Sequence, residues 1–307
     1  MSCCFGEFLT EYTPLDAIFG ESYVRWVQTT HKIPGGSAVT YAKYLTSTAS
    51  RGDYYTRDGG SERDRPVPSR WHGSETLSSL GLAAQRPVQR GDLRSVMKGC
   101  SPLDGGPLRP AGSDGTRTAG VELMFAPPKT VSALWAAAGP YRRAQLEAAH
   151  GRAVKSTLAR TEREVALVRR KTGGVVRFEK PRRLLAAEFV HTSSRLAADQ
   201  QASGIPDPQL HSHVVVFAAE RHDGKLAAVE SKQLYRAARE NGAWYRAELA
   251  QNLAELGVRI ERRTGENAAP VSDGRSSRHA ARSAGRSTAR SPRSRSRRCR
   301  RSPGRAA

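Results

Sequence analysis

PDPQLHSHVVV, residues Pro206–Val216, combines a run of β-branched residues with two histidines two positions apart. Residues i and i+2 of a strand share one face, so His211 and His213 should point the same way. A second predicted strand, Leu184–His191, ends in another histidine. If the two strands are neighbours, three imidazoles converge, a pattern typical of catalytic rather than closed structural metal sites. In isolation, an HxH pair is more often core packing than a pair of ligands.

Glu122 lies on a further predicted strand, Val121–Phe125, which ends before two prolines. A carboxylate there can hydrogen-bond a ligating imidazole and fix its tautomer, or accept a proton from a nucleophile. The plainer interpretation is an exposed glutamate on a strand.

Tyrosines gather near the N-terminus, where Tyr41, Tyr44, Tyr54 and Tyr55 fall within fifteen positions. A phenol is a poor nucleophile at neutral pH until a base or a cation favours the phenolate. A tyrosine cluster can equally stack nucleic-acid bases or pack in a core. Spacing alone favours packing.

The remaining pattern mixes helices and strands without regular strand–helix–strand alternation, which favours an α+β fold around an antiparallel sheet. Residues 1–34 match no regular pattern, and residues 59–118, rich in Gly, Pro, Ser and Arg, predict long surface connections. Four histidines are interpreted as ordinary residues of loops or of a helix surface: His31, His72, His150 and His222. Helices are expected in the first half of 35–58 and over 130–138, 141–171 and 234–256, and strands over 121–125, 175–178, 184–191, 210–219 and 226–229.

The formal net charge of +21 divides between two parts of the chain. From residue 265 onward, twelve Arg against two acids give +10, which leaves +11 for residues 1–264. A globular part this basic suits a polyanionic partner, although a merely basic protein is the alternative. The Arg/Ser-rich tail, 263–307, is expected to be disordered. A nucleic-acid-binding arm and translation in a shifted reading frame explain it equally well.

Hydropathy argues for a cytoplasmic protein without a membrane span. No apolar run approaches the roughly 20 residues that cross a bilayer. The first twenty residues lack the basic start and the apolar stretch of a secretory signal.

Taken together, these segments resemble the relaxase domain of TrwC/TraI-type (MobF) conjugative relaxases, within the HUH endonuclease superfamily. The motif DPQLH-x-H with an upstream HxxSR is highly specific, and the resemblance covers about residues 35–262. It implies a palm-like antiparallel sheet with flanking helices, placed between an N-terminal extension (1–34) and the tail. The segments that carry it are Pro206–Val216, FVHTSSR (Phe189–Arg195), VELMFAPPKTVS (Val121–Ser132) and YLTSTASRGDYYTRDG (Tyr44–Gly59), with weaker similarity in RWHG (Arg70–Gly73), SLGL (Ser79–Leu82) and YRAELAQNLAELG (Tyr245–Gly257).

The resemblance also implies a chemistry. His191, His211 and His213 would hold a divalent metal ion, Mg or Mn, with Zn or another transition metal as the alternative. A tyrosine would attack the scissile phosphate of single-stranded DNA, forming a 5′-phosphotyrosyl link and releasing a 3′-OH. The implied partners are single-stranded and hairpin DNA at a transfer origin, and relaxosome accessory proteins.

Individual roles follow from the matched positions. Tyr44 corresponds to the first family tyrosine, with Tyr41 as its rival, and Tyr54 and Tyr55 form the second pair. The resemblance implies that Tyr54 could serve a second transesterification. Glu122 stands where the family usually has Asp, and would orient a histidine or activate the tyrosine. Two further residues are expected to contact DNA: Lys129 and Arg195.

The sequence departs from the family pattern in several places. Lys43 rather than a second tyrosine precedes Tyr44, Glu replaces Asp at position 122, and Leu196–Ile205 is an apparent insertion between two of the histidines. We expect a truncated chain that lacks the helicase half of full-length members.

Three alternatives remain open. A truncated, non-catalytic DNA-binding remnant of a relaxase is the one that the departures favour. A rolling-circle replication initiator would share the chemistry. A three-histidine zinc hydrolase would need neither the tyrosines nor the basic charge.

Overall fold

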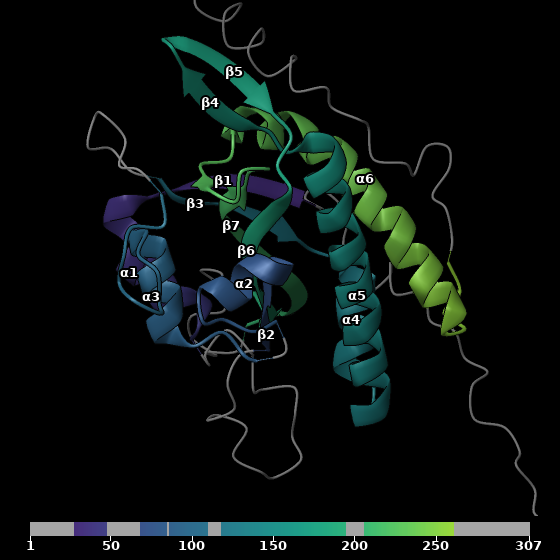
Figure 1. Ribbon diagram of the computed structural model, residues 1–307. Coiled ribbons are helices and arrows are strands. Elements are labelled where there is room, and N and C mark those ends of the chain that lie inside the picture. The colour runs from purple at the N-terminus through teal and green to yellow at the C-terminus, as the bar shows by residue number, and fades with distance from the viewer. Residues whose placement is uncertain (1–27, 48–67, 85, 110–117, 195–205, 261–307) are drawn as a thin grey trace, which may run out of the picture. The chain divides into compact units, whose positions relative to one another are not determined.

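The computed structural model describes residues 28–47, 68–84, 86–109, 118–194 and 206–260, which form a central antiparallel sheet with helices on both faces (Figure 1). This is the predicted α+β architecture. The tail and most of the N-terminal extension lie outside the described residues. The sheet order is β1 (Gln28–Pro34), β3 (Thr118–Phe125), β7 (Pro208–Glu220), β6 (Arg183–Ser193) and β2 (Ser69–His72), with β8 (Leu226–Ala227) paired to β7.

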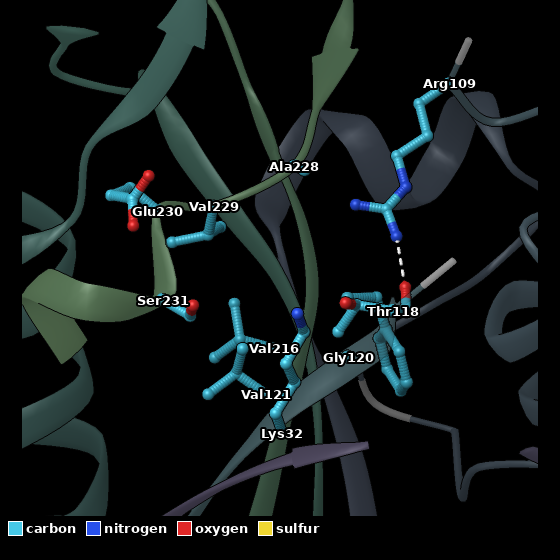
Figure 2. A pocket seen from close by; sticks show the side chains of 11 residues that line it. Lys32, Arg109, Thr118, Gly120, Val121, Val216, Ala228, Val229, Glu230 and Ser231 are labelled. Carbon is cyan, nitrogen blue, oxygen red and sulfur yellow. Dashed lines mark hydrogen bonds between the residues drawn. The ribbon is translucent and has the colours of Figure 1, made fainter. Parts of the chain in front are cut away.

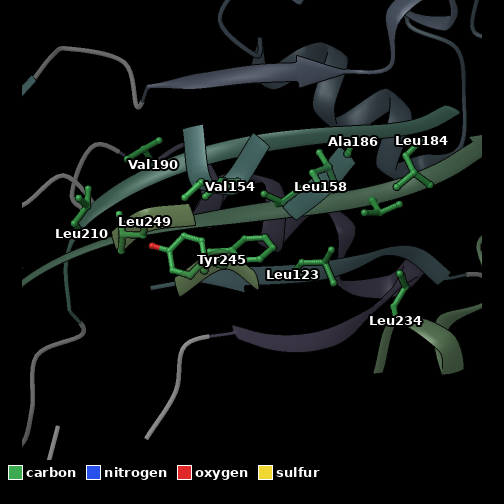
Figure 3. Packing of buried hydrophobic residues seen from close by; sticks show 14 of the residues in the cluster. Leu123, Val154, Leu158, Leu184, Ala186, Val190, Leu210, Leu234, Tyr245 and Leu249 are labelled. Atoms are coloured by element: carbon green, nitrogen blue, oxygen red, sulfur yellow. The ribbon is translucent and has the colours of Figure 1, made fainter. Parts of the chain in front are cut away.

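One face of the sheet packs against three helices: α4 (Lys129–Ala137), α5 (Pro140–Arg160) and α6 (Ser231–Glu255). Leucine and valine side chains from β3, β6 and β7 meet the apolar faces of α5 and α6 (Figure 3). Tyr245 of α6 is completely buried in this layer and packs its ring against Phe125 of β3.

The other face packs against α1 (Ala38–Leu45), α2 (Ser74–Ser79) and α3 (Arg90–Lys98). Phe189 of β6 and Val215 of β7 point into this second core. The central strands are therefore buried on both faces, which explains the nearly continuous apolar run in Pro206–Val216. Within β7, Val214 faces α5 and α6, whereas the neighbouring His213 shares the face of Val215.

Two predicted irregular regions contain regular structure. Residues 28–34 form the edge strand β1, and part of 59–118 forms β2, α2 and α3. Leu93, Val96 and Met97 of α3 are buried at helical spacing. These elements are short and are separated by Gly- and Pro-rich connections, so the average composition of the region predicts loops and does not reveal them.

The helix predicted to run to residue 171 is too long. It ends at Arg160, and a π-helical turn, Thr161–Val165, leads into the hairpin of β4 (Val168–Thr172) and β5 (Val175–Glu179). Gly173 and Gly174 both have positive φ, +57° and +82°, as a two-residue hairpin turn requires. The glycine pair therefore turns a hairpin instead of ending a helix.

No helix in the described ranges combines the length and the apolarity that a membrane span needs.

Gly120 lies where β3 runs very close to β7. An added Cβ would lie 2.8 Å from Cγ1 of Val215 and 3.0 Å from the carbonyl oxygen of Val216. We expect Gly120→Ala to lower the free energy of unfolding by about 1–3 kcal/mol, because overpacking forces strand atoms apart. Urea denaturation measures this. Gly91→Ala, in open space on α3, is the matched control, and equal stability of the two variants would contradict the expectation.

A crevice beside Gly120 is lined by residues of β1, β3, β7 and the segment before α6 (Figure 2). Lys32 and Arg109 bring positive charge to it, and Arg109 donates a hydrogen bond to the carbonyl of Thr118 at 2.5 Å. None of the predicted site residues lines this crevice. The predicted chemistry therefore belongs to another part of the sheet.

Candidate metal centre and active site

Strand pairing brings the three predicted histidines together. β6 and β7 are antiparallel with His191 opposite His211, and alternation places His213 on the same face. The ring centroids lie 4.6 Å (His191–His213), 4.9 Å (His211–His213) and 5.3 Å (His191–His211) apart. All three side chains are buried, and one nitrogen from each lies within 4.8 Å of the others. Three imidazoles thus converge as the strand pattern predicts.

Two of these histidines each donate a hydrogen bond from one ring nitrogen to a backbone carbonyl. Nε2 of His191 donates to the carbonyl of Leu45 at 3.1 Å, and Nδ1 of His211 donates to the carbonyl of Gln209 at 2.8 Å. Because a carbonyl only accepts, the opposite nitrogen of each ring keeps its lone pair. Burial lowers the pKa of His191 to about 3 and that of His211 well below its ordinary value. Both imidazoles are therefore neutral at neutral pH, the form that binds metals.

The third histidine is held by a carboxylate. Nδ1 of His213 donates to Glu122 at 2.5 Å, and both side chains are almost completely buried. Burial raises the pKa of Glu122, but hydrogen bonds from His213 and Tyr41 outweigh it and hold that pKa below its ordinary value. Glu122 is thus an ionised acceptor that leaves Nε2 of His213 available. The interpretation of Glu122 as an exposed strand residue is wrong.

The structure gives Tyr44 and Tyr41 different surroundings. Both lie on α1, with ring centroids 5.7 Å apart. The Tyr44 hydroxyl is 3.4 Å from Nε2 of His213, and the Tyr44 ring stands edge-on to His191 and His213. Tyr41 instead hydrogen-bonds Glu122. Of the two tyrosines, Tyr44 faces the histidines directly, whereas Tyr41 contacts Glu122, the residue that holds His213.

The donor set fits a divalent metal ion. Three imidazoles, each with one nitrogen fixed by an oxygen acceptor, match the way proteins orient ligating histidines. Three protein ligands are also fewer than the four of a closed structural site.

The other predicted site residues fall elsewhere. Nζ of Lys129 lies 3.3 Å from Oδ2 of Asp207, the aspartate of the DPQLH motif, so a contact between this lysine and DNA remains a prediction. The remaining three lie outside the described residues: Tyr54, Tyr55 and Arg195.

Two histidines interpreted as ordinary surface residues are not. His150 is completely buried between α5 and the sheet, and His72 hydrogen-bonds the buried carboxylate of Glu188 at 3.0 Å. A usable signal was present for His150, because it shares a helical face with Leu146 and Ala153.

Acidification should destabilise the metal-free protein. His150 has a pKa of about 4 and His191 of about 3 in the folded state, against an ordinary value of 6.5, because burial disfavours the charged form. Below pH 6.5 the unfolded chain therefore binds more protons, and the free energy of unfolding falls as pH falls. Between pH 6.5 and about pH 5 we expect a loss of about 2 kcal/mol for each such histidine.

Urea denaturation with a chelator present measures this loss. His222→Gln, which replaces an exposed histidine, should keep the full dependence. A flat profile over this pH range would contradict the expectation.

Comparison with known proteins identifies the family to which the sequence and the fold are similar. The family model of the TrwC relaxase matches residues 38–305. The multifunctional conjugation protein TraI of Escherichia coli is 31% identical over 227 residues, and that of strain K12 is 29% identical over the same length. Each match covers 71% of this chain, whereas the chain spans only 12% of the length of either relative.

Solved structures of the conjugative relaxase TrwC have the same fold. A copper-bound complex with oriT DNA is 30% identical, with a TM-score of 0.60 over 78% of this chain and 73% of that one. A metal-free complex with oriT DNA is 28% identical, with a TM-score of 0.59 over 79% and 74%. A complex with a 27-mer DNA comprising the recognition hairpin and the cleavage site is 27% identical, with a TM-score of 0.58 over 78% and 72%. Since the family model matches most of its residues, this chain belongs to the TrwC relaxase family.

Proposed function

We propose that this protein is a metal-dependent relaxase that nicks single-stranded DNA at a plasmid transfer origin and stays attached to the cleaved strand. The observation that carries the proposal is the Tyr44 hydroxyl, which is half-buried on α1 and lies 3.4 Å from Nε2 of His213, one of three convergent histidines. The TrwC structures bound to oriT DNA, in copper-bound and other metal-bound forms, support the same substrate and a metal.

The proposed reaction is a transesterification. The Tyr44 oxygen attacks phosphorus, a Tyr–O–P bond forms and the P–O3′ bond breaks, while the proton lost by the phenol balances the one gained by the 3′ oxygen. A divalent ion held by the three histidines would withdraw charge from the scissile phosphate. Glu122 orients His213, and Tyr41 orients Glu122.

We propose Mg or Mn as the ion, because phosphoryl transfer commonly uses these metals. An imidazole donor set also has high intrinsic affinity for Zn and Cu, so these compete. Relaxosome accessory proteins as partners and a cytoplasmic location belong to the same proposal.

The hairpin of β4 and β5 is proposed to bind the duplex stem of hairpin DNA. It projects beyond the main sheet (Figure 1). Arg169, Lys171 and Arg177 are exposed on it, together with half-exposed apolar side chains such as Phe178. A two-stranded ribbon fits the major groove, and arginine and lysine contact phosphates.

Neutralising this ribbon should weaken binding to hairpin DNA and reduce its salt dependence. For the triple variant Arg169→Ala, Lys171→Ala, Arg177→Ala, the slope of log Kd against log salt should fall by about one per lost phosphate contact. Fluorescence anisotropy at several salt concentrations measures it. Arg246→Ala, an exposed cation on α6, is the control for a change in net charge. An unchanged slope in the triple variant would show that the β4–β5 hairpin does not contact the DNA phosphates.

A direct test of the function uses labelled single-stranded oligonucleotides that span candidate transfer origins, with Mn or Mg. A denaturant-resistant protein–DNA adduct is the expected product. Tight binding without an adduct would instead identify a non-catalytic DNA-binding protein. If neither adduct nor binding occurs, the proposed function is wrong.

A further inference from the structure

A chain of hydrogen bonds runs behind the metal centre, on the opposite face of the sheet. The Tyr245 hydroxyl lies 2.7 Å from Nδ1 of His150, and Nε2 of His150 lies 2.8 Å from Oγ of Ser212. Ser212 in turn lies 3.1 Å from Oε1 of Glu188. All four side chains are 0% exposed, within a layer that is otherwise apolar.

The chain of hydrogen bonds ends at the buried carboxylate of Glu188, which two partly exposed side chains of β2 contact. Oε2 of Glu188 receives hydrogen bonds from Nε of Arg70 at 3.1 Å and from Nε2 of His72 at 3.0 Å. Burial raises the pKa of Glu188, but these partners outweigh it and hold that pKa below its ordinary value. Glu188 is therefore ionised and can only accept.

This fixes the direction of every bond in the chain. Because Glu188 accepts, Ser212 donates to it and must accept from Nε2–H of His150. Nδ1 of His150 then accepts from the Tyr245 hydroxyl. Every buried polar group of the chain is satisfied in this one arrangement, and bonds aligned in this way strengthen one another.

The position of the chain relates it to the histidines. Ser212 lies between His211 and His213 on β7, and its side chain points to the other face. Glu188 lies on β6, which carries His191. The chain therefore joins both histidine-bearing strands to each other and joins β7 to α5 and α6, at the level where the imidazoles converge.

Burying polar groups in an apolar layer costs desolvation free energy, and leucine or phenylalanine would fill the same space without that cost. The hydrogen-bonded side chains also contact no atom of the reaction site. The geometry of these hydrogen bonds is therefore that of a group that holds β7 in position, and not that of a group that takes part in the reaction.

We propose that Ser212, His150 and Glu188 are positioning residues that fix strand β7 and thereby set the metal affinity of the three histidines. The proposal rests on the proposed metal site. Without the Ser212 hydroxyl, Nε2–H of His150 and Oε1 of Glu188 lose their partner, and β7 must shift to satisfy them. The imidazoles on either side of Ser212 then move with the backbone.

The test is a titration of the metal-stripped full chain with Co²⁺, whose visible absorption reports the arrangement of its ligands. We expect Ser212→Ala to raise the Co²⁺ dissociation constant about tenfold or more and to alter the absorption bands. Thr161→Val is the matched control, because Thr161, at the start of the π-helical turn after α5, has a buried hydroxyl that accepts a hydrogen bond from Asn241 away from the histidines. It should lower the melting temperature and leave Co²⁺ binding unchanged.

Tyr245→Phe is a second, milder variant that removes only the last hydroxyl of the chain, and it serves if Ser212→Ala does not fold. A smaller rise in the dissociation constant is expected. Wild-type affinity and an unchanged spectrum in the folded variants would overturn the positioning role. A wild-type chain that binds no Co²⁺ would overturn the metal site itself, and the two failures are therefore distinguishable.

Discussion

Tyr44→Phe is expected to abolish the covalent protein–DNA adduct, whereas Tyr41→Phe is expected to keep it. The Tyr44 hydroxyl faces the three histidines and is 3.4 Å from Nε2 of His213, whereas Tyr41 hydrogen-bonds Glu122. Removing a nucleophile costs a factor of about a thousand or more in rate. Denaturing gel electrophoresis of the chain with a 5′- and a 3′-labelled oligonucleotide measures the adduct and identifies the attached end.

The smaller effect of Tyr41→Phe has its own reason. The lost hydrogen bond is one of those that hold Glu122 in place, so the carboxylate orients His213 less firmly. We expect adduct formation to slow about tenfold without disappearing.

Both tyrosine variants should bind the oligonucleotide as tightly as the wild type and have similar melting temperatures, which excludes misfolding as the cause. An adduct that persists in Tyr44→Phe and is lost in Tyr41→Phe would exchange the two roles. Persistence in both single variants would move the nucleophile to Tyr54 or Tyr55.

The convergence of the histidines could be predicted because strand periodicity is a local property. His211 and His213 share a face wherever β7 lies, and only the pairing of β7 with β6, which brings in His191, depends on the tertiary structure. The family motif supplied that pairing.

The burial of Glu122 could not be predicted in the same way. A strand pattern does not say which partner covers a given face, and Glu122 is covered by His213 and by Tyr41 from distant parts of the chain. Tertiary packing therefore decides whether this carboxylate is a surface residue or part of a site.

Local ambiguity explains other errors. Val168–Thr172 is mostly polar, so the strand β4 looked like the end of a helix, and the glycine pair after it fits either a helix stop or a hairpin turn. The roles of His150 and Ser212 depend on a contact between α5 and β7 that no local pattern encodes.

Removal of one histidine should abolish both metal binding and adduct formation. His211→Ala is the cleanest choice, because Nδ1 of His211 bonds only the nearby carbonyl of Gln209, whereas loss of His213 would leave the buried Glu122 without its partner. We expect the metal dissociation constant to rise at least about a hundredfold, more than for the loss of a group that only orients a ligand. Isothermal titration calorimetry with Mn²⁺ and with Zn²⁺ measures it.

His222→Ala, which removes an exposed histidine from the turn after β7, controls for the loss of an imidazole elsewhere and should keep full metal affinity. A chelator should stop adduct formation by the wild type, and added metal should restore it to the wild type but not to His211→Ala. If His211→Ala bound metal normally, the three imidazoles would be packing residues. If it lost metal but still formed the adduct, Tyr44 would attack a phosphate whose charge is stabilised by cationic side chains of the protein, without a metal ion at this centre.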